Sequence, residues 1–256
     1  MARVIAIANQ KGGVGKTTTT VNLSACLAVK GKRVLTIDID PQGNTTSGLG
    51  IDKTDVRESI YDVIINDVPL QETVLPTKIE TLGISPSNIH LAGAEVELVS
   101  VISREMRLKT DIAVLKNQYD YILIDCPPSL GLLTVNALTA ADTILVPIQC
   151  EYYALEGLSQ LMNTVRIVQK HLNPALKVEG VVLTMFDART NLSIQVVEEV
   201  KKYFGNQVYR TIIPRNVRLS EAPSFGLPII LYDEKSRGAE SYMELADEVI
   251  VTAEGR

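Results

Sequence analysis

The chain has 256 residues, a formal net charge of −5 and 46% hydrophobic residues, which suits one large α/β domain with a sizeable core. It offers no run of about 18 apolar residues to span a membrane, and its mild acidity excludes a general attraction to nucleic acid, so DNA binding needs a local basic patch. The N-terminus lacks the apolar block and cleavage site of a signal peptide. Because the three cysteines have no metal or disulfide spacing, we expect a cytoplasmic protein with reduced thiols.

Short runs rich in β-branched residues predict the strands of a sheet. They are continuously apolar rather than alternating, as in strands covered by helices on both faces. Helical patterns lie between them, such as the apolar stripe from Leu155 to Leu172 that Asn173-Pro174 ends. This alternation predicts a doubly wound, mostly parallel α/β sheet with helices on both faces, in a single domain of residues 1–256. The predicted strands cover residues 3–8, 33–38, 121–125, 143–148, 178–186 and 208–214.

A glycine-rich loop, QKGGVGKTTTT at residues 10–20, follows the first predicted strand. An open α/β sheet binds its ligand at this position. Glycines let backbone N–H groups turn around phosphate oxygens, and the next helix presents its positive N-terminal end. We expect Lys16 to neutralise the β- and γ-phosphates and the Thr17 hydroxyl to ligate Mg²⁺. The predicted phosphate-binding residues are Lys11, Gly12, Gly13, Val14, Gly15, Lys16, Thr17 and Thr18.

Two residues depart from the standard spacing G-x-x-x-x-G-K-[ST]: Gln10 replaces its first glycine, and Lys11 is a second lysine before the other glycines. Lys11 fits a solvated lysine in a turn. It also fits a cation that reaches a nucleotide held by a second subunit, because it precedes the turn that wraps the phosphates. A cation supplied in this way accelerates phosphoryl transfer by roughly 10³–10⁵ in arginine-finger systems, and a lysine, without the forked geometry, should give less. Spacing alone leaves both readings open.

Carboxylates end two of the predicted strands. Asp38 and Asp40 stand in TIDIDPQGN, where Asp-Pro and Gly-Asn also suit a simple turn. Asp125 follows three apolar strand residues in ILIDCPP, a pattern typical of a Walker B aspartate that coordinates Mg²⁺ through water, although it could instead cap the following helix. A carboxylate at the end of a buried strand needs a cation or hydrogen-bond donors to offset its desolvation.

Residues 66–93 carry scattered prolines and mixed patterning, and no element is assigned to them. Further along, the segment 187–218 has six basic and three acidic residues, a local charge of +3 in a chain of net −5. Charge counting fits an ordinary solvated helix with its flanking loops as well as it fits a nucleic-acid-binding patch. No aromatic cluster or recognition-helix motif indicates that bases are read.

The motif KGGVGKT resembles the deviant Walker A motif of the ParA/MinD superfamily. The resemblance extends over almost the whole chain. In detail the chain is similar to the Soj-type chromosome-partitioning ParA proteins of spore-forming bacilli. The further motifs that carry it are DIDPQGNTTSGLG (38–50), YILIDCPPSLGLLTVNAL (121–138), QCEYYALEGLSQL (149–161) and PRNVRLSEAPSFGLPI (214–229).

The resemblance implies roles for individual residues. Lys11 would act across a nucleotide-sandwich dimer, and Asp40 would orient the attacking water, while Asp38 would act from outside the first shell of ligands. The residues expected around Mg²⁺ are Thr17, Asp40 and Asp125, those around adenine are Pro214, Arg215 and Asn216, and those on DNA are Arg189 and Arg218. The DPQGN loop and the loop that contains Pro127, Pro128 and Gly131 would act as switches that sense the γ-phosphate.

The activity that the resemblance implies is Mg²⁺-dependent ATP hydrolysis in chromosome or plasmid partitioning. ATP would join two subunits, the dimer would bind double-stranded DNA nonspecifically on the nucleoid, and a ParB-like partner would stimulate the hydrolysis that releases it. Two features of the sequence favour this expectation over a sequence-specific repressor and over a membrane-cycling ATPase of the MinD type. The sequence begins at the first predicted strand, so we do not expect the N-terminal DNA-binding domain that larger plasmid repressors carry. The C-terminus, MELADEVIVTAEGR, is acidic, unlike the basic amphipathic helix of a MinD-type membrane anchor.

Overall fold

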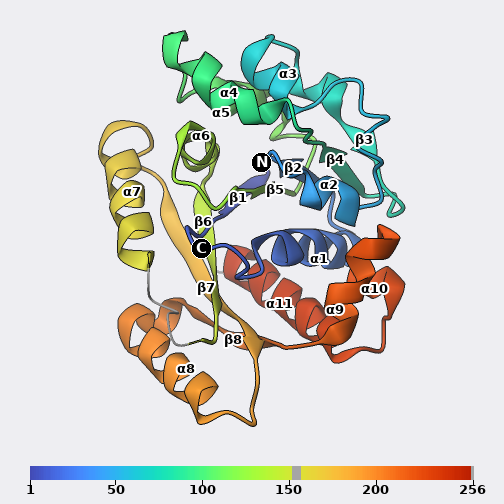
Figure 1. Cartoon of the computed structure of the whole chain (residues 1–256), viewed down its shortest axis with the longest axis vertical. Helices are drawn as coiled ribbons and strands as arrows, with labels where there is room; N and C mark the ends of the chain where they lie inside the picture. The colour runs from blue at the N-terminus through green and yellow to red at the C-terminus, as the bar shows by residue number, and fades with distance from the viewer. Residues whose placement is uncertain (152–156, 255–256) are drawn as a thin grey trace.

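The computed structural model describes residues 1–151 and 157–254, whose strands join into one eight-stranded sheet in the order β3-β4-β2-β5-β1-β6-β7-β8 (Figure 1). Neighbouring strands are parallel except β3 and β4, which are antiparallel. The strands are β1 (Arg3–Ile7), β2 (Val34–Asp38), β3 (Leu75–Pro76), β4 (Leu82–Ser85), β5 (Tyr121–Asp125), β6 (Thr143–Gln149), β7 (Lys177–Phe186) and β8 (Val208–Pro214).

The predicted fold class and all six predicted strands are confirmed, with ends that differ by one residue at most. The unassigned segment 66–93 supplies β3 and β4. The former is a two-residue edge strand that ends at Pro76, too short to leave a pattern in the sequence. The latter pairs with β2 from Leu82 to Ser85 but contains Gly83, which weakens its strand pattern.

The helices alternate with the strands. They are α1 (Lys16–Val29), α2 (Asn44–Gly48), α3 (Ile60–Ile65), α4 (Leu91–Glu97), α5 (Arg107–Leu115), α6 (Leu132–Ala140), α7 (Leu158–His171), α8 (Asn191–Phe204), α9 (Val217–Glu221), α10 (Ile229–Tyr232) and α11 (Arg237–Glu254). The stripe predicted to begin at Leu155 is helical from Leu158 to His171, and Leu155 itself lies outside the described residues. None of the helices in the described ranges is both long and apolar enough to cross a membrane.

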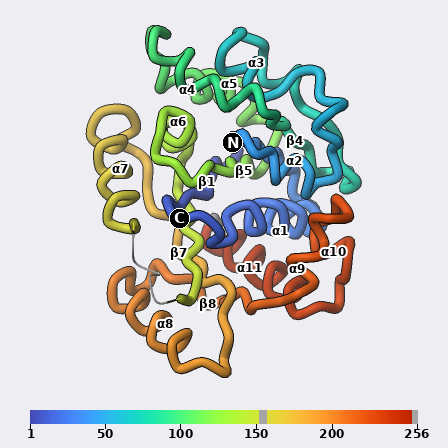
Figure 2. The backbone as a smooth tube through the Cα atoms, viewed as in Figure 1, coloured from blue at the N-terminus to red at the C-terminus, as the bar shows by residue number. Residues whose placement is uncertain are grey.

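Two hydrophobic cores cover the two faces of the sheet. One is built with α3 to α8, whose buried residues include Ile60, Leu108 and Val165. The other is built with α1 and α9 to α11, which lie together in Figures 1 and 2, and it includes Leu23 and Leu245. Because both faces are covered, the central strands β2 and β5 are buried along their whole length and mostly apolar, as the sequence predicts.

The order of the strands places the glycine-rich loop. From β1 the chain crosses through α1 to β2 on one side, and from β5 it crosses through α6 to β6 on the other side of β1. The connections therefore diverge at the carboxyl end of β1, and such a switch point is where open α/β sheets bind their ligands. Asp38 of β2 and Asp125 of β5 are paired in register at the same edge.

Candidate nucleotide-binding site

The loop between β1 and α1 has the backbone that phosphate binding requires. Gly13 and Gly15 have φ angles of 74° and 90°, in the left-handed region that favours glycine. Gly15 is also the N-cap of α1 and provides no side chain to the free N–H groups there, so these groups and the positive end of the helix face the loop. Strand β7 supports the loop, because the Thr184 hydroxyl donates to the Val14 carbonyl oxygen at 2.8 Å.

The two lysines of the loop differ in environment. Lys16 is 7% exposed, and its Nζ donates to the Lys11 carbonyl oxygen at 3.0 Å. Burial lowers the pKa of the Lys16 ammonium, and the charges of Asp125 and Asp40 partly offset this effect. Lys11 is half-buried, and no residue in the described part of the chain forms an ion pair with its ammonium group. A buried cation and a second, unpaired one therefore stand on the same loop.

Asp125 is fully buried and accepts hydrogen bonds from three threonine hydroxyls. Thr17 and Thr45 donate to Oδ2 at 2.8 and 2.7 Å, and Thr20 donates to Oδ1 at 3.1 Å. Burial raises the pKa of Asp125, whereas the threonine hydrogen bonds lower it. Thr20 and Thr45 are not among the predicted site residues. Thr20 lies one helical turn beyond Lys16, and this spacing could have suggested that both face the same side.

The carboxylates of the DPQGN segment are held differently. Asp38 is fully buried, and its Oδ2 accepts from the Thr46 backbone N–H at 2.8 Å and from the Thr46 hydroxyl at 2.7 Å. Burial, and then the charge of Asp125, raises the pKa of Asp38. Asp40 is 8% exposed and lines a cavity beside Lys16, and its Oδ1 accepts from the Gln42 backbone N–H at 2.9 Å. Of the two aspartates, Asp40 therefore faces the open space of the site.

Two adjoining cavities meet at the loop and share Gly15, Thr18 and Met185. The first has a volume of about 390 Å³ and is lined by residues that include Gly12, Gly13, Lys16, Thr17, Asp40 and Pro128. The second, of about 240 Å³, contains the predicted adenine residues Pro214, Arg215 and Asn216. The pair can accommodate an extended ligand with a phosphate part and an apolar part.

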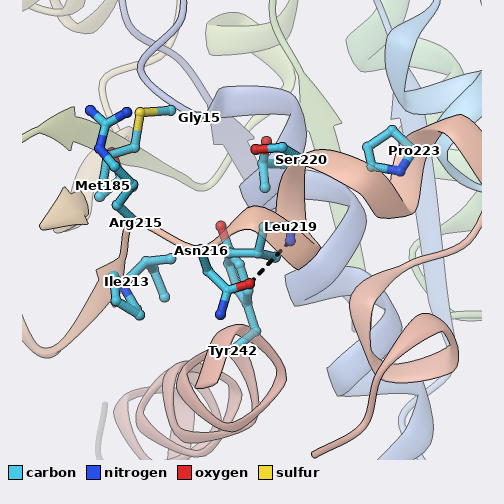
Figure 3. A pocket seen from close by; sticks show the side chains of 12 residues that line it. Gly15, Met185, Ile213, Arg215, Asn216, Leu219, Ser220, Pro223 and Tyr242 are labelled. Carbon is cyan, nitrogen blue, oxygen red and sulfur yellow. Dashed lines mark hydrogen bonds between the residues drawn. The ribbon is translucent and has the colours of Figure 1, made fainter. Parts of the chain in front are cut away.

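Figure 3 shows the second cavity, with Met185 and Arg215 on one side and Ser220 and Pro223 on the other. Asn216 caps α9 by accepting from the Leu219 backbone N–H at 3.3 Å. Met185 has a φ angle of 52°, which is uncommon for a residue other than glycine and recurs at ligand sites. Neither the position of Met185 nor that of Tyr242, which also lines the cavity, is predicted from the sequence.

The predicted DNA-binding arginines lie outside both cavities and are paired with acidic residues. Arg189 donates from Nε and Nη2 to the two carboxylate oxygens of Asp187, at 2.9 and 2.7 Å. Arg218 contacts Glu221 at 3.0 Å and Asp233 at 3.5 Å. The last two acids lie beyond residue 218, so the charge count of 187–218 omits them. Part of the motif at 149–161 lies outside the described residues.

The open parallel sheet, the left-handed glycines and the buried lysine at the start of α1 define a P-loop nucleotide-binding protein. The described residues contain no cluster of three or more His, Cys, Asp or Glu side chains that could hold a metal ion alone. Oxygen ligands for Mg²⁺ are nevertheless present in Thr17 and Asp125, and Mg²⁺ is usually bound by few protein groups together with phosphates and water.

Comparison with known proteins identifies the family. A family model described as an AAA domain matches residues 2–178. The sporulation initiation inhibitor protein Soj of Bacillus subtilis is 67% identical over 249 residues, 97% of this chain and 98% of that protein. The chromosome partitioning protein ParA of Myxococcus xanthus is 58% identical, over 98% of this chain and 88% of the relative. The chain thus belongs to the ParA/MinD family of P-loop ATPases, in the group of the Soj and ParA chromosome-partitioning proteins.

Solved structures agree with this assignment. Cobyrinic acid a,c-diamide synthase from Mycobacterium smegmatis, with bound ADP and magnesium, has a TM-score of 0.88 and 40% identity over 100% of this chain and 97% of its own. The septum site-determining protein MinD from Pyrococcus horikoshii, complexed with Mg-ADP, has a TM-score of 0.82 and 30% identity, with 99% and 98% covered. The expected resemblance to ParA and MinD proteins is confirmed.

Proposed function

We propose that residues 1–256 act as one ParA-type ATPase domain that partitions chromosomes or plasmids. The observation that carries the proposal is the junction of the two cavities at the P-loop. Buried Lys16 and Asp40 line the larger cavity, and buried Asp125 accepts a hydrogen bond from Thr17 in its wall. The 67% identity to Soj supports the partitioning role. A cytoplasmic, nucleoid-associated location follows from this role.

ATP and Mg²⁺ fit the residues present. Lys16 and the N–H groups of the glycine-rich loop would hold the phosphates, and Thr17 and Asp125, whose side chains are 2.8 Å apart, would supply oxygen ligands to Mg²⁺. When bound, the ion neutralises the charge on the phosphate oxygens. The second cavity, which contains Pro214, Arg215 and Asn216, would take the adenine.

Asp40 has the role of orienting the attacking water. Its carboxylate lines the cavity, and one of its oxygens is fixed by the Gln42 N–H. Phosphoryl transfer passes through a loose transition state, so alignment of the nucleophile matters more than strong basicity. Lys11 supplies its charge to the nucleotide of a second subunit, and its ammonium is unpaired among the described residues, which leaves it available for that contact.

Dimerisation couples nucleotide to DNA. One subunit presents Arg189 and Arg218, which are too few for strong binding, and a dimer doubles them. Each neutralised phosphate steepens the salt dependence by about 0.9 in log–log slope. A ParB-like partner stimulates hydrolysis, which separates the subunits and releases the DNA.

The test is co-sedimentation with nonspecific double-stranded DNA in the presence of ATP, ADP or no nucleotide, at two salt concentrations. We expect sedimentation with ATP and Mg²⁺ at low salt, and little otherwise. Binding that is equal with and without nucleotide would contradict the coupling between ATP and DNA.

Variants separate the steps of the cycle. Lys16→Ala should lose ATP binding, Lys11→Ala should lose turnover, and Asp40→Ala should stay on DNA with ATP bound. Arg189→Glu and Arg218→Glu should dimerise normally but lose DNA. Arg166→Glu, an equal change of charge on the exposed side of α7, is the matched control and should bind DNA normally. Normal turnover by Asp40→Ala would refute the role assigned to that residue.

A further inference from the structure

Helix α6 begins at a glycine that cannot cap it. Its N-cap is Gly131, and no side-chain cap is formed by that residue, although the first N–H groups of a helix need acceptors. Glu95, on α4, takes this role: its Oε1 accepts from the Leu133 backbone N–H at 3.3 Å. The negative carboxylate is also well placed at the positive end of the helix.

The contact with Gly131 itself is close. A Cβ added to Gly131 would lie 2.1 Å from Oε1 and 2.8 Å from Cδ of Glu95. The backbone of Gly131 has a φ of −80°, which any residue can adopt. The absence of a side chain at residue 131 therefore leaves the space that the Glu95 carboxylate occupies, and the backbone conformation there does not need a glycine.

Glu95 thereby fixes the end of a loop that borders the nucleotide site. Residues 126–131 connect Asp125, at the end of β5, to α6. Pro128 in this loop lines the first cavity, the one that contains Lys16 and Asp40. Inside the loop, the Ser129 carbonyl oxygen accepts from the Thr134 hydroxyl at 2.6 Å. The position of the loop beside the cavity thus depends on where α6 begins.

The segment that carries Glu95 also contacts helix α2, which directly follows the DPQGN loop. The Ser87 backbone N–H donates to the Thr46 hydroxyl at 2.9 Å, and this hydroxyl donates to Asp38 at 2.7 Å. Helix α4 is anchored beneath by Leu91 and Ala94, which are fully buried. One segment, residues 87–95, therefore contacts both α2, next to the DPQGN loop, and the start of α6, next to the 126–131 loop.

We propose that Glu95 is a positioning residue for ATP hydrolysis. By capping α6 and filling the space at Gly131, it holds the 126–131 loop in the conformation that supports hydrolysis. The inference rests on the proposed ATPase function. Loss of a helix cap typically changes a local equilibrium by about fivefold, and activity falls with the population of the competent loop.

The first test is steady-state kinetics. For Glu95→Ala we expect kcat to fall by up to about fivefold, with KM for ATP changed less than about twofold. Glu95→Gln keeps an acceptor oxygen of the same reach and should restore most of the activity. Glu97→Ala is the matched control, because Glu97 is a glutamate of the same helix whose partner is the Tyr61 hydroxyl on α3 and not the loop. Wild-type kcat in Glu95→Ala, or an equal loss in Glu97→Ala, would overturn the proposal.

The second test uses the close contact. Gly131→Ala should lower kcat in the wild-type background because the new Cβ displaces the carboxylate. In Glu95→Ala the space is free, so the same change should have little further effect, and the two losses should not multiply. Multiplicative losses would show that the two residues act separately, against the proposal.

A third test does not depend on turnover. The chain has no tryptophan, so Ser129→Trp, at an exposed loop position, provides a single reporter. In nucleotide-free protein, Glu95→Ala should lower its fluorescence anisotropy, and Glu97→Ala should not. If the reporter responds and wild type hydrolyses no ATP, the proposed function fails while the contact between helix and loop stands. If wild type hydrolyses ATP and the reporter is silent, the inference on Glu95 fails alone.

Discussion

Two arginines of the segment 187–218, Arg189 and Arg218, are held in ion pairs with acidic side chains. Arg189 is 86% exposed at its side chain, yet both oxygens of Asp187 accept from its guanidinium group. The guanidinium lowers the pKa of Asp187 to about 2. A phosphate of DNA must therefore compete with a carboxylate that is charged at every pH at which the protein is handled.

This pairing gives a prediction for DNA affinity. Asp187→Asn removes the competing charge and should strengthen ATP-dependent DNA binding by up to about fivefold at low salt, since exposed ion pairs are weak. The measurement is fluorescence anisotropy of labelled DNA at several salt concentrations.

The sign of the pH dependence follows from the lowered pKa. A carboxylate whose pKa is depressed keeps its interaction above its ordinary pKa of about 4 and loses it only as the pH falls through about 2. Between pH 8 and pH 5 the Asp187 carboxylate therefore stays charged and keeps Arg189 paired. The affinity of the wild-type protein for DNA should not rise through loss of this ion pair in that range. Weaker binding by Asp187→Asn would mean that Asp187 supports the arginine rather than competing with DNA for it.

At the scale of elements, the packing of β8 against β7 positions one wall of the second cavity, which contains Pro214, Arg215 and Asn216. A Cβ on Gly180 would lie 2.5 Å from the Tyr209 ring and 3.0 Å from the Gln207 carbonyl oxygen, so β8 can lie against β7 only because residue 180 has no side chain. The last two residues of β8, Ile213 and Pro214, line that cavity.

Gly180→Ala should therefore push β8 outward. Overpacking of this kind costs roughly 1–3 kcal/mol of stability, and nucleotide affinity should fall because the Pro214–Asn216 wall shifts. Chemical denaturation and titration with a fluorescent ATP analogue measure the two effects. Lys177→Ala, exposed on the same strand, should stay within about 0.5 kcal/mol of wild type, and a similar result for Gly180→Ala would show that the strands adjust without cost.

The elements also show how far sequence reasoning extends. The six long strands are predictable because burial on both faces makes them continuously apolar, and the loop of residues 10–18 is predictable because glycine and lysine spacing follows directly from phosphate chemistry. The roles of Thr45 and Glu95 are not predictable in this way. Thr45 is 80 positions from its partner Asp125, and Glu95 is 38 positions from its partner Leu133. Contacts of that separation depend on packing, which a local pattern does not encode.

At the scale of the whole molecule, the three cysteines are free and buried. Burial raises the pKa of Cys26 and of Cys150 to about 12 and raises that of Cys126 as well. Folding thus favours the protonated thiols. In the unfolded chain the thiols lose their protons near pH 8.5, so their contribution to the free energy of unfolding is complete below that pH and declines as the pH rises toward 12.

We therefore expect the denaturant concentration at the unfolding midpoint to decrease as the pH is raised from 8.5 to 11. We also expect the thiols of the folded protein to be unreactive to iodoacetamide at pH 8. Mass spectrometry of alkylated peptides, with and without denaturant, measures the second effect. Rapid alkylation of native Cys126 would contradict its burial beside Asp125.

The edge formed by β3 restricts how copies of this protein can assemble. It offers only two residues, Leu75 and Pro76, and the proline has no N–H to give. A neighbouring chain finds almost no ladder of backbone groups to extend there, so copies of the protein that meet at the β3 edge must be joined through side chains.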